Sequence, residues 1–142
     1  MLAPLTNVQS HADGRLSDDE FQWLTYRATG GFGHVMTCAA HIQRVGQGFP
    51  GQLGNFGDEH LSGLKRLATA IRAEGAVSSV QLHHAGIRAP AELIGEQPRG
   101  PSDDAEFKAR ALGEGEVETL IEDFVAAATR AEKAGLDGVE LH

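Results

Sequence analysis

The stretch that decides the fold is AEKAGLDGVELH, residues 131–142 at the end of the given sequence. Its first four residues finish an amphipathic helix, and Gly135 ends that helix. The apolar run after Gly135 predicts a short strand over 137–141. A helix that leads within a few residues into a buried strand is typical of a β/α unit with a parallel sheet.

The rest of the chain repeats this alternation. Apolar residues at helical spacing, such as Leu61, Leu64, Ala68 and Ile71, predict helices, and Ser17 with Glu20 three residues later predicts a capping box. The last helix carries an apolar stripe of Val117, Leu120, Ile121, Phe124, Ala128 and Ala131. The predicted order is strand 1–5, helix 16–31, strand 33–40, helix 58–75, strand 76–84, helix 115–135 and strand 137–141.

This order predicts right-handed crossovers and an α/β fold with a parallel sheet. A parallel sheet is covered on both faces or closed into a barrel, and an eight-stranded (β/α)8 barrel takes about 250 residues. Four strands and three helices are half of such a barrel. We therefore expect residues 1–142 to be the N-terminal half of a single TIM-barrel domain, with no second domain. Residues 88–113 are expected to form a long loop.

Composition excludes several classes of function. The net charge is −8, and no run of Lys or Arg exceeds two residues, which argues against nucleic-acid binding. No apolar run is long enough for a membrane span, and no secretion signal is visible. The one cysteine, Cys38, cannot form an internal disulfide and is expected in the core. We expect a cytoplasmic protein.

Ligands of parallel sheets bind at the carboxyl ends of the strands. Small and polar residues follow each predicted strand: APLTN at 3–7, TCAAH at 37–41, QLHHAG at 81–86 and His142. Because side chains alternate along a strand, Val80 and Leu82 are expected to face the helices. Gln81 and His142 would then share one interior rim.

These segments resemble the old yellow enzyme family of FMN-dependent NAD(P)H:flavin oxidoreductases, or ene-reductases. The resemblance rests on APLTN, GGFGHVMTCAA, DEHLSGL, VQLHHAG and AEKAGLDGVELH, which occur in order along nearly the whole chain. It implies that NAD(P)H reduces FMN and that the flavin then reduces the activated C=C bond of an α,β-unsaturated carbonyl compound. It covers about the first half of the family's barrel.

The resemblance also implies roles for individual residues. Pro4, Leu5 and Thr6 would lie against the flavin, with the threonine hydroxyl tuning its potential. Ala39 would let the ring approach, and the Gln81 carboxamide would read the pyrimidine edge. His142 would hold the carbonyl oxygen of the substrate, where hydrogen-bond donors stabilise the developing enolate. The family's partner His/Asn, three residues later, and its proton-donating tyrosine lie beyond this sequence.

No metal site is expected. His83 and His84 are adjacent in a predicted strand, so their side chains would point to opposite faces and could not chelate together. The stretch GQGFPGQLGNFG, 46–57, lacks the Lys-Ser/Thr ending of a phosphate-binding P-loop.

Two alternatives stay open. The chain can be a non-catalytic half-barrel that assembles with itself or with a complementary fragment, since unpaired strand edges are templates for pairing. A barrel lyase or aldolase would need a Schiff-base lysine, but Lys65, Lys108 and Lys133 fall on predicted helices or the long loop. The chain alone is expected to bind FMN poorly.

Overall fold

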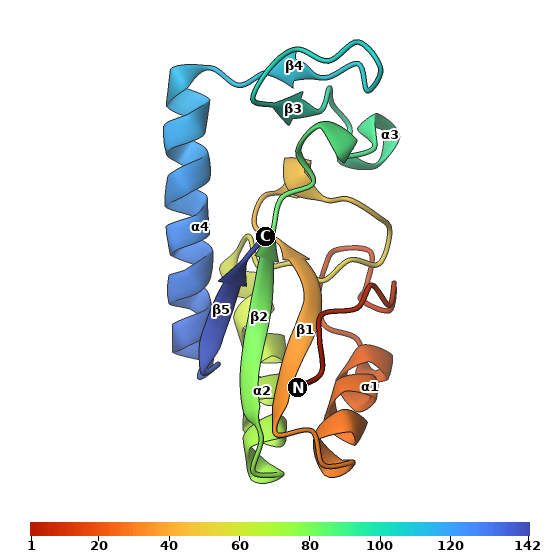
Figure 1. The fold of residues 1–142 in the computed structure, drawn as a ribbon, viewed down its shortest axis with the longest axis vertical. Helices are drawn as coiled ribbons and strands as arrows, with labels where there is room; N and C mark the ends of the chain where they lie inside the picture. The colour runs from red at the N-terminus through yellow and green to blue at the C-terminus, as the bar shows by residue number, and fades with distance from the viewer.

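The computed structural model describes all residues 1–142, and a parallel sheet forms its centre (Figure 1). The strands β1 (His34–His41), β2 (Val77–His83) and β5 (Gly138–Leu141) lie in the order β1-β2-β5, and both pairs are parallel. Leu2 pairs in parallel with Val35 on the free edge of β1. The sheet therefore has the predicted strand order and direction.

The first predicted strand is reduced to this single bridge. Leu2 donates to the carbonyl of His34 and accepts from the amide of Met36, at 2.8 and 3.3 Å. Pro4 follows two residues later and has no N–H to give to a ladder, so pairing with β1 ends there. The prediction of a strand over 1–5 was too long.

The three predicted long helices are present as α1 (Asp18–Thr29), α2 (Leu61–Ala73) and α4 (Glu114–Ala134). One apolar cluster packs α2 and α4 on β1 and β2, and a second packs α1 and α2 on the start of β1. Val80 and Leu82 are fully buried in the first cluster, so they face the helices as predicted. Short 3-10 turns, η1 (Arg44–Gly46) and η2 (Asp58–His60), lie in the connection before α2.

The start of α1 differs from the predicted capping box. Ser17 is the N-cap, and its hydroxyl accepts from the Glu20 amide at 3.1 Å. The Glu20 side chain, however, does not return to the N-cap backbone; it is fully buried and accepts hydrogen bonds from Asn7, Ser10 and Cys38. The predicted bond from the Glu20 amide to the Ser17 hydroxyl is confirmed. The predicted bond from the Ser17 backbone to the Glu20 carboxyl group is wrong, because that carboxyl group bonds to residues outside the helix instead.

The segment 88–113 is more ordered than the predicted loop. It contains the end of η3 (Gly86–Arg88), then α3 (Ala91–Ile94), β3 (Arg99–Gly100) and β4 (Arg110–Ala111), and the last two form a small parallel pair. Arg99 and Arg110 both form ion pairs with Glu116, in the first turn of α4. These contacts attach the segment to α4 above the carboxyl end of the sheet (Figure 1).

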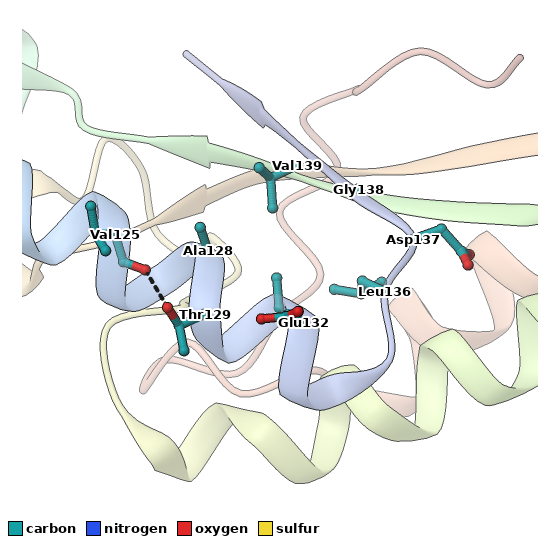
Figure 2. Close-up of a pocket in the computed structure, with 9 residues that line it drawn as sticks. Val125, Ala128, Thr129, Glu132, Leu136, Asp137, Gly138 and Val139 are labelled. Carbon is teal, nitrogen blue, oxygen red and sulfur yellow. Dashed lines mark hydrogen bonds between the residues drawn. The ribbon is translucent and has the colours of Figure 1, made fainter.

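The outer surface of α4 and β5 is apolar and uncovered. Val117 and Ile121, predicted in the buried stripe of the last helix, are 43% and 59% exposed, while Ala127 and Ala131 make the buried contact. Val125 and Val139 line a hollow of about 440 Å³ between α4 and β5 (Figure 2). The apolar arc of α4 is wider than the part that packs on the sheet.

No helix is both long enough and apolar enough to cross a membrane.

Candidate functional site

The face of the sheet opposite the helices carries a row of three residues from three strands. Ala39 of β1 is paired with Gln81 of β2, and Gln81 is paired with Glu140 of β5. The Gln81 side chain is 6% exposed, and its Nε2 donates to Oε2 of Glu140 at 3.3 Å. One N–H and the oxygen of the Gln81 carboxamide remain for a ligand.

A second row lies one step nearer the carboxyl ends of the strands. The rings of His83 and His142 stack, with centroids 5.7 Å apart and planes at 23°. The backbone N–H of His142 donates to the Leu82 carbonyl at 2.8 Å, which keeps His142 in line with β2. Its Nδ1 lies 3.9 Å from Oε1 of Glu140. Gln81 and His142 thus share one rim, here called the lip, defined by Ala39, Gln81, His83, Glu140 and His142.

Gln52 fixes the orientation of this lip from the connection before α2. It is fully buried, and its Oε1 accepts from the Gly48 amide at 2.7 Å. Its Nε2 donates to the carbonyl of Ala39 and lies against Nδ1 of His83, both at 3.1 Å. Since Nε2 of an amide only donates, Nδ1 of His83 accepts, and the proton of the neutral ring is on Nε2.

Electrostatics keeps His83 neutral. Burial lowers the pKa of His83 below its ordinary value, and the neighbouring His142 lowers it further. At neutral pH, His83 therefore presents an uncharged N–H donor beside His142.

Pro4, Leu5 and Thr6 lie outside this group of contacts. They follow the bridge at Leu2 and pass along the edge of β1 away from β2 (Figure 1). Leu5 and Thr6 are exposed, and no hydrogen bond ties the Thr6 hydroxyl to another residue. The structure brings Ala39, Gln81 and His142 together, while no hydrogen bond joins residues 4–6 to Gln81 or His142.

His84 belongs to a separate chain of hydrogen bonds, which links the end of β2 to α4. Its Nδ1 accepts from the Gly86 amide at 2.9 Å, and its Nε2 donates to Oε1 of Gln43 at 3.1 Å. Gln43 in turn donates to Asp123 of α4 at 2.6 Å. Burial lowers the pKa of His84 to about 4. With both ring nitrogens used in this way, His84 is directed away from the lip.

Alternation along the last strand predicts that Glu140 points to the same interior face as His142, and the structure confirms this placement, although the sequence assigned Glu140 no role. Gln52 was not singled out from the sequence, because it comes from a glycine-rich connection whose path depends on the tertiary structure.

The lip is suited to a flat heteroaromatic group with mixed donors and acceptors. Ala39 has a small side chain, so a ring can approach the backbone of β1, and Gln81 has a free donor and a free acceptor. The residues of the lip therefore fit one edge of a flavin. The chain offers no glycine-rich strand-to-helix turn with the Lys-Ser/Thr ending of a P-loop for the phosphate end.

The lip lies at the carboxyl end of a parallel β/α sheet, which is where β/α barrels place their ligand sites. The chain belongs to the NADH:flavin oxidoreductase / NADH oxidase family, whose model matches residues 1–142. Membership confirms the predicted cofactor, FMN, and NAD(P)H as reductant, at the level of the family. It also confirms the class of enzyme predicted from the resemblance.

Individual relatives agree with this assignment. A probable NADH-dependent flavin oxidoreductase, YqiG of Bacillus subtilis (strain 168), is 43% identical over 145 residues, which cover 99% of this chain and 39% of the relative. An NADH:fumarate oxidoreductase of Klebsiella pneumoniae (strain 342) is 35% identical over 148 residues and is covered to 16%. The chain thus spans less than half the length of these relatives.

Solved structures show the same fold. A 2-naphthoyl-CoA reductase complex superposes with a TM-score of 0.91 at 32% identity, over 99% of this chain and 24% of that one. The old yellow enzyme homologue from Zymomonas mobilis superposes with a TM-score of 0.88 at 28% identity, over 99% and 43%. The partial barrel predicted from the sequence is confirmed.

Proposed function

We propose that residues 1–142 are the N-terminal half of an FMN-binding barrel that uses NAD(P)H to reduce the activated C=C bond of an α,β-unsaturated carbonyl compound. The observation that carries this proposal is the lip, where Gln81 and His142 lie on one face at the carboxyl end of the sheet. Bound FMN would supply the hydride chemistry, taking a hydride from NAD(P)H and giving it to the substrate.

Each residue has a defined task in this proposal. Gln81 binds the pyrimidine edge with its free N–H and oxygen, and Ala39 leaves room for the ring. Pro4, Leu5 and Thr6 line the cofactor from the other edge of β1. His142 donates to the carbonyl oxygen of the substrate and stabilises the negative charge that develops there. The names of the relatives, which include reductases of fumarate and of a naphthoyl thioester, support a conjugated carboxyl or carbonyl substrate.

The test needs a complete barrel. Residues 1–142 are joined to the part of the B. subtilis relative that follows its matched segment, and this product is called the hybrid protein. We expect the hybrid protein to be purified with the visible absorbance of a flavin and to reduce a simple cyclic enone with NADH or NADPH.

Two substitutions separate binding from catalysis. Gln81→Ala is expected to weaken FMN binding about tenfold, the effect of one or two lost hydrogen bonds. His142→Ala is expected to keep FMN bound and to lower kcat by about 10²-fold, the usual effect of removing a donor to an oxyanion. Lys65→Ala, on the far side of α2, is the control. A hybrid protein that folds but shows no flavin absorbance would refute the proposal.

A non-catalytic role as an assembly module is the second candidate. It is supported by the uncovered apolar surface of α4 and β5, where Val125 and Val139 line an open hollow (Figure 2). Leu141, further along β5, is 68% exposed. Light scattering after size-exclusion chromatography of residues 1–142 tests it. We expect dimers or larger assemblies, and a folded monomer at high concentration would refute this second proposal.

A further inference from the structure

A fully buried glutamate, Glu20, lies behind two segments of the proposed flavin site. It is located in the first turn of α1, and no part of its side chain is exposed. It forms no ion pair with a lysine, arginine or histidine. An uncompensated carboxyl group in a core is unfavourable unless it is hydrogen-bonded, so its partners indicate what it does.

The first partners are in the connection that follows Thr6. Asn7 donates from Nδ2 to Oε1 of Glu20 at 3.1 Å, and the hydroxyl of Ser10 donates to Oε2. Oδ1 of Asn7 also accepts from the Gln9 amide at 3.3 Å, so the Asn7 side chain joins its own segment to the carboxyl group. This connection includes Val8, whose φ of +50° is in the left-handed region that a β-branched residue avoids.

The remaining partner lies on β1, next to Ala39. Sγ of Cys38 donates to Oε1 of Glu20 at 3.0 Å. Cys38 lies within a bulge of β1 between Met36 and Ala39, and pairing with β2 resumes at Ala39. Cys38 is directed to Glu20 of α1, whereas Ala39 lies on the lip. Glu20 therefore bonds to the residue directly after Thr6 and to the residue directly before Ala39.

We propose that Glu20 is a positioning residue for the flavin, whose carboxyl group fixes the segment of Pro4, Leu5 and Thr6 relative to Ala39. The inference rests on the proposed function. Glu20 acts through Asn7 and Cys38 and does not touch the cofactor. Without the shared carboxyl group, a segment that is exposed at Leu5 and Thr6 would be attached to β1 only by the bridge at Leu2.

A purely structural role for Glu20 would be to stabilise α1, and Ser17 provides a matched control for that role. Ser17 caps the same helix, and Ser17→Ala removes the cap without removing any contact to Asn7, Ser10 or Cys38. Glu20→Gln keeps the size of the side chain but leaves one oxygen for three donors. Both variants are expected to lower the melting temperature, but only Glu20→Gln is expected to change the flavin site.

The first measurement uses residues 1–142 without FMN. We expect Glu20→Gln to speed hydrogen exchange at the amides of residues 7–10 and labelling of Cys38, the only thiol in the chain, by about tenfold each, the result of one or two lost hydrogen bonds. Ser17→Ala should leave both rates within twofold of the wild type. Equal acceleration in the two variants would show that Glu20 only stabilises α1, which overturns the inference whatever the protein binds.

The second measurement uses the hybrid protein with FMN. We expect Glu20→Gln to weaken FMN binding about tenfold and to shift the visible spectrum and midpoint potential of the flavin, while Ser17→Ala changes neither. Asn7→Ala, a half-buried position that should fold in any case, is expected to weaken FMN binding similarly, and the double variant should be no weaker than either single variant. Additive effects would refute action through Asn7.

The two measurements separate the two possible failures. A hybrid protein that binds no flavin refutes the proposed function, while the exchange and labelling rates still decide whether Glu20 holds the two segments together. If FMN binds and Glu20→Gln leaves its affinity, spectrum and potential unchanged, the proposed function stands and the role of Glu20 as a positioning residue is refuted.

Discussion

Mild acid should destabilise this fold, and His41 should account for a large part of the effect. His41 ends β1 and is 2% exposed. Its Nδ1 donates to the Gln43 carbonyl at 2.9 Å, and its ring packs on Phe56 with centroids 4.8 Å apart. Burial above all, together with the charges of His60, His83 and Arg44, lowers the pKa of His41 to about 4, against the opposing effect of the hydrogen bond to Gln43.

The sign follows from comparing the folded and unfolded chains. An unfolded histidine titrates near pH 6.5. Between this value and the lower pKa of folded His41, the unfolded chain therefore binds a proton that the folded chain does not bind. The stabilisation by neutral His41 is complete above about pH 7, falls as the pH decreases, and is lost below about pH 4. Integrating the difference in bound protons gives a loss of about 2 kcal/mol between pH 7.5 and pH 5.

Carboxyl groups contribute little over this interval. Hydrogen bonds from Arg110 and from the Gly113 amide, with the charges of Arg110 and Arg99, lower the pKa of Glu116 to about 2. The hydrogen bond from the Ser78 amide lowers the pKa of Asp137. Their stabilisation is present above the unfolded value near pH 4 and is lost only below it. The interval from pH 7.5 to pH 5 therefore isolates the buried histidines.

The assay is urea unfolding of the wild type and of His41→Phe at both pH values. The variant keeps a ring against Phe56 and removes the titrating group. We expect the loss of unfolding free energy between the two pH values to be about 2 kcal/mol smaller in the variant. Phe56→Leu is the control, because it removes packing at both pH values equally and should keep the wild-type difference. The same pH dependence in the wild type and His41→Phe would refute this reasoning.

The remaining predictions concern packing, backbone and thiol chemistry. Leu82→Ala, at a fully buried position, should lower the unfolding free energy by about 2–5 kcal/mol. Leu141→Ala, at a position that is 68% exposed, should lower it by about 0.5 kcal/mol or less, and urea unfolding measures both values. Gly51→Ala should destabilise by more than about 1 kcal/mol, since φ is +70° and the new Cβ would lie 2.6 Å from the carbonyl oxygen of Val8; thermal unfolding measures it. Cys38 should be alkylated slowly at pH 8 in the folded chain, because burial raises the pKa of its thiol; mass spectrometry of the labelled protein measures the rate.

Elements with an uninterrupted period could be predicted from the sequence. The helical spacing of Leu64, Ala68 and Ile71 depends only on local geometry, and these residues are buried as expected. The same holds for β2, which has no irregularity relative to β5, so alternation places Gln81 and His83 on one face. The half of the lip on β2 and β5 follows from the sequence for this reason.

Features set by tertiary contacts could not be predicted in this way. The Ser17–Glu20 spacing matches a capping box, but the Glu20 carboxyl group bonds to Asn7, Ser10 and Cys38. The local pattern is correct for the backbone of α1 and wrong for the side chain, because burial against β1 offers better partners than the helix terminus. No feature of residues 17–20 alone indicates those partners.

The position of Ala39 shows most clearly where counting along a sequence fails. Val35 faces the helices, and strict alternation from Val35 would place Ala39 on that same face, away from any ligand. Between Met36 and Ala39, however, β1 uses three steps where β2 uses two, from Ser79 to Gln81. This extra residue reverses the parity, so Ala39 joins Gln81 on the lip. The resemblance to flavin oxidoreductases predicted the role of Ala39, and the bulge is the physical reason that the residue can be in position to perform it.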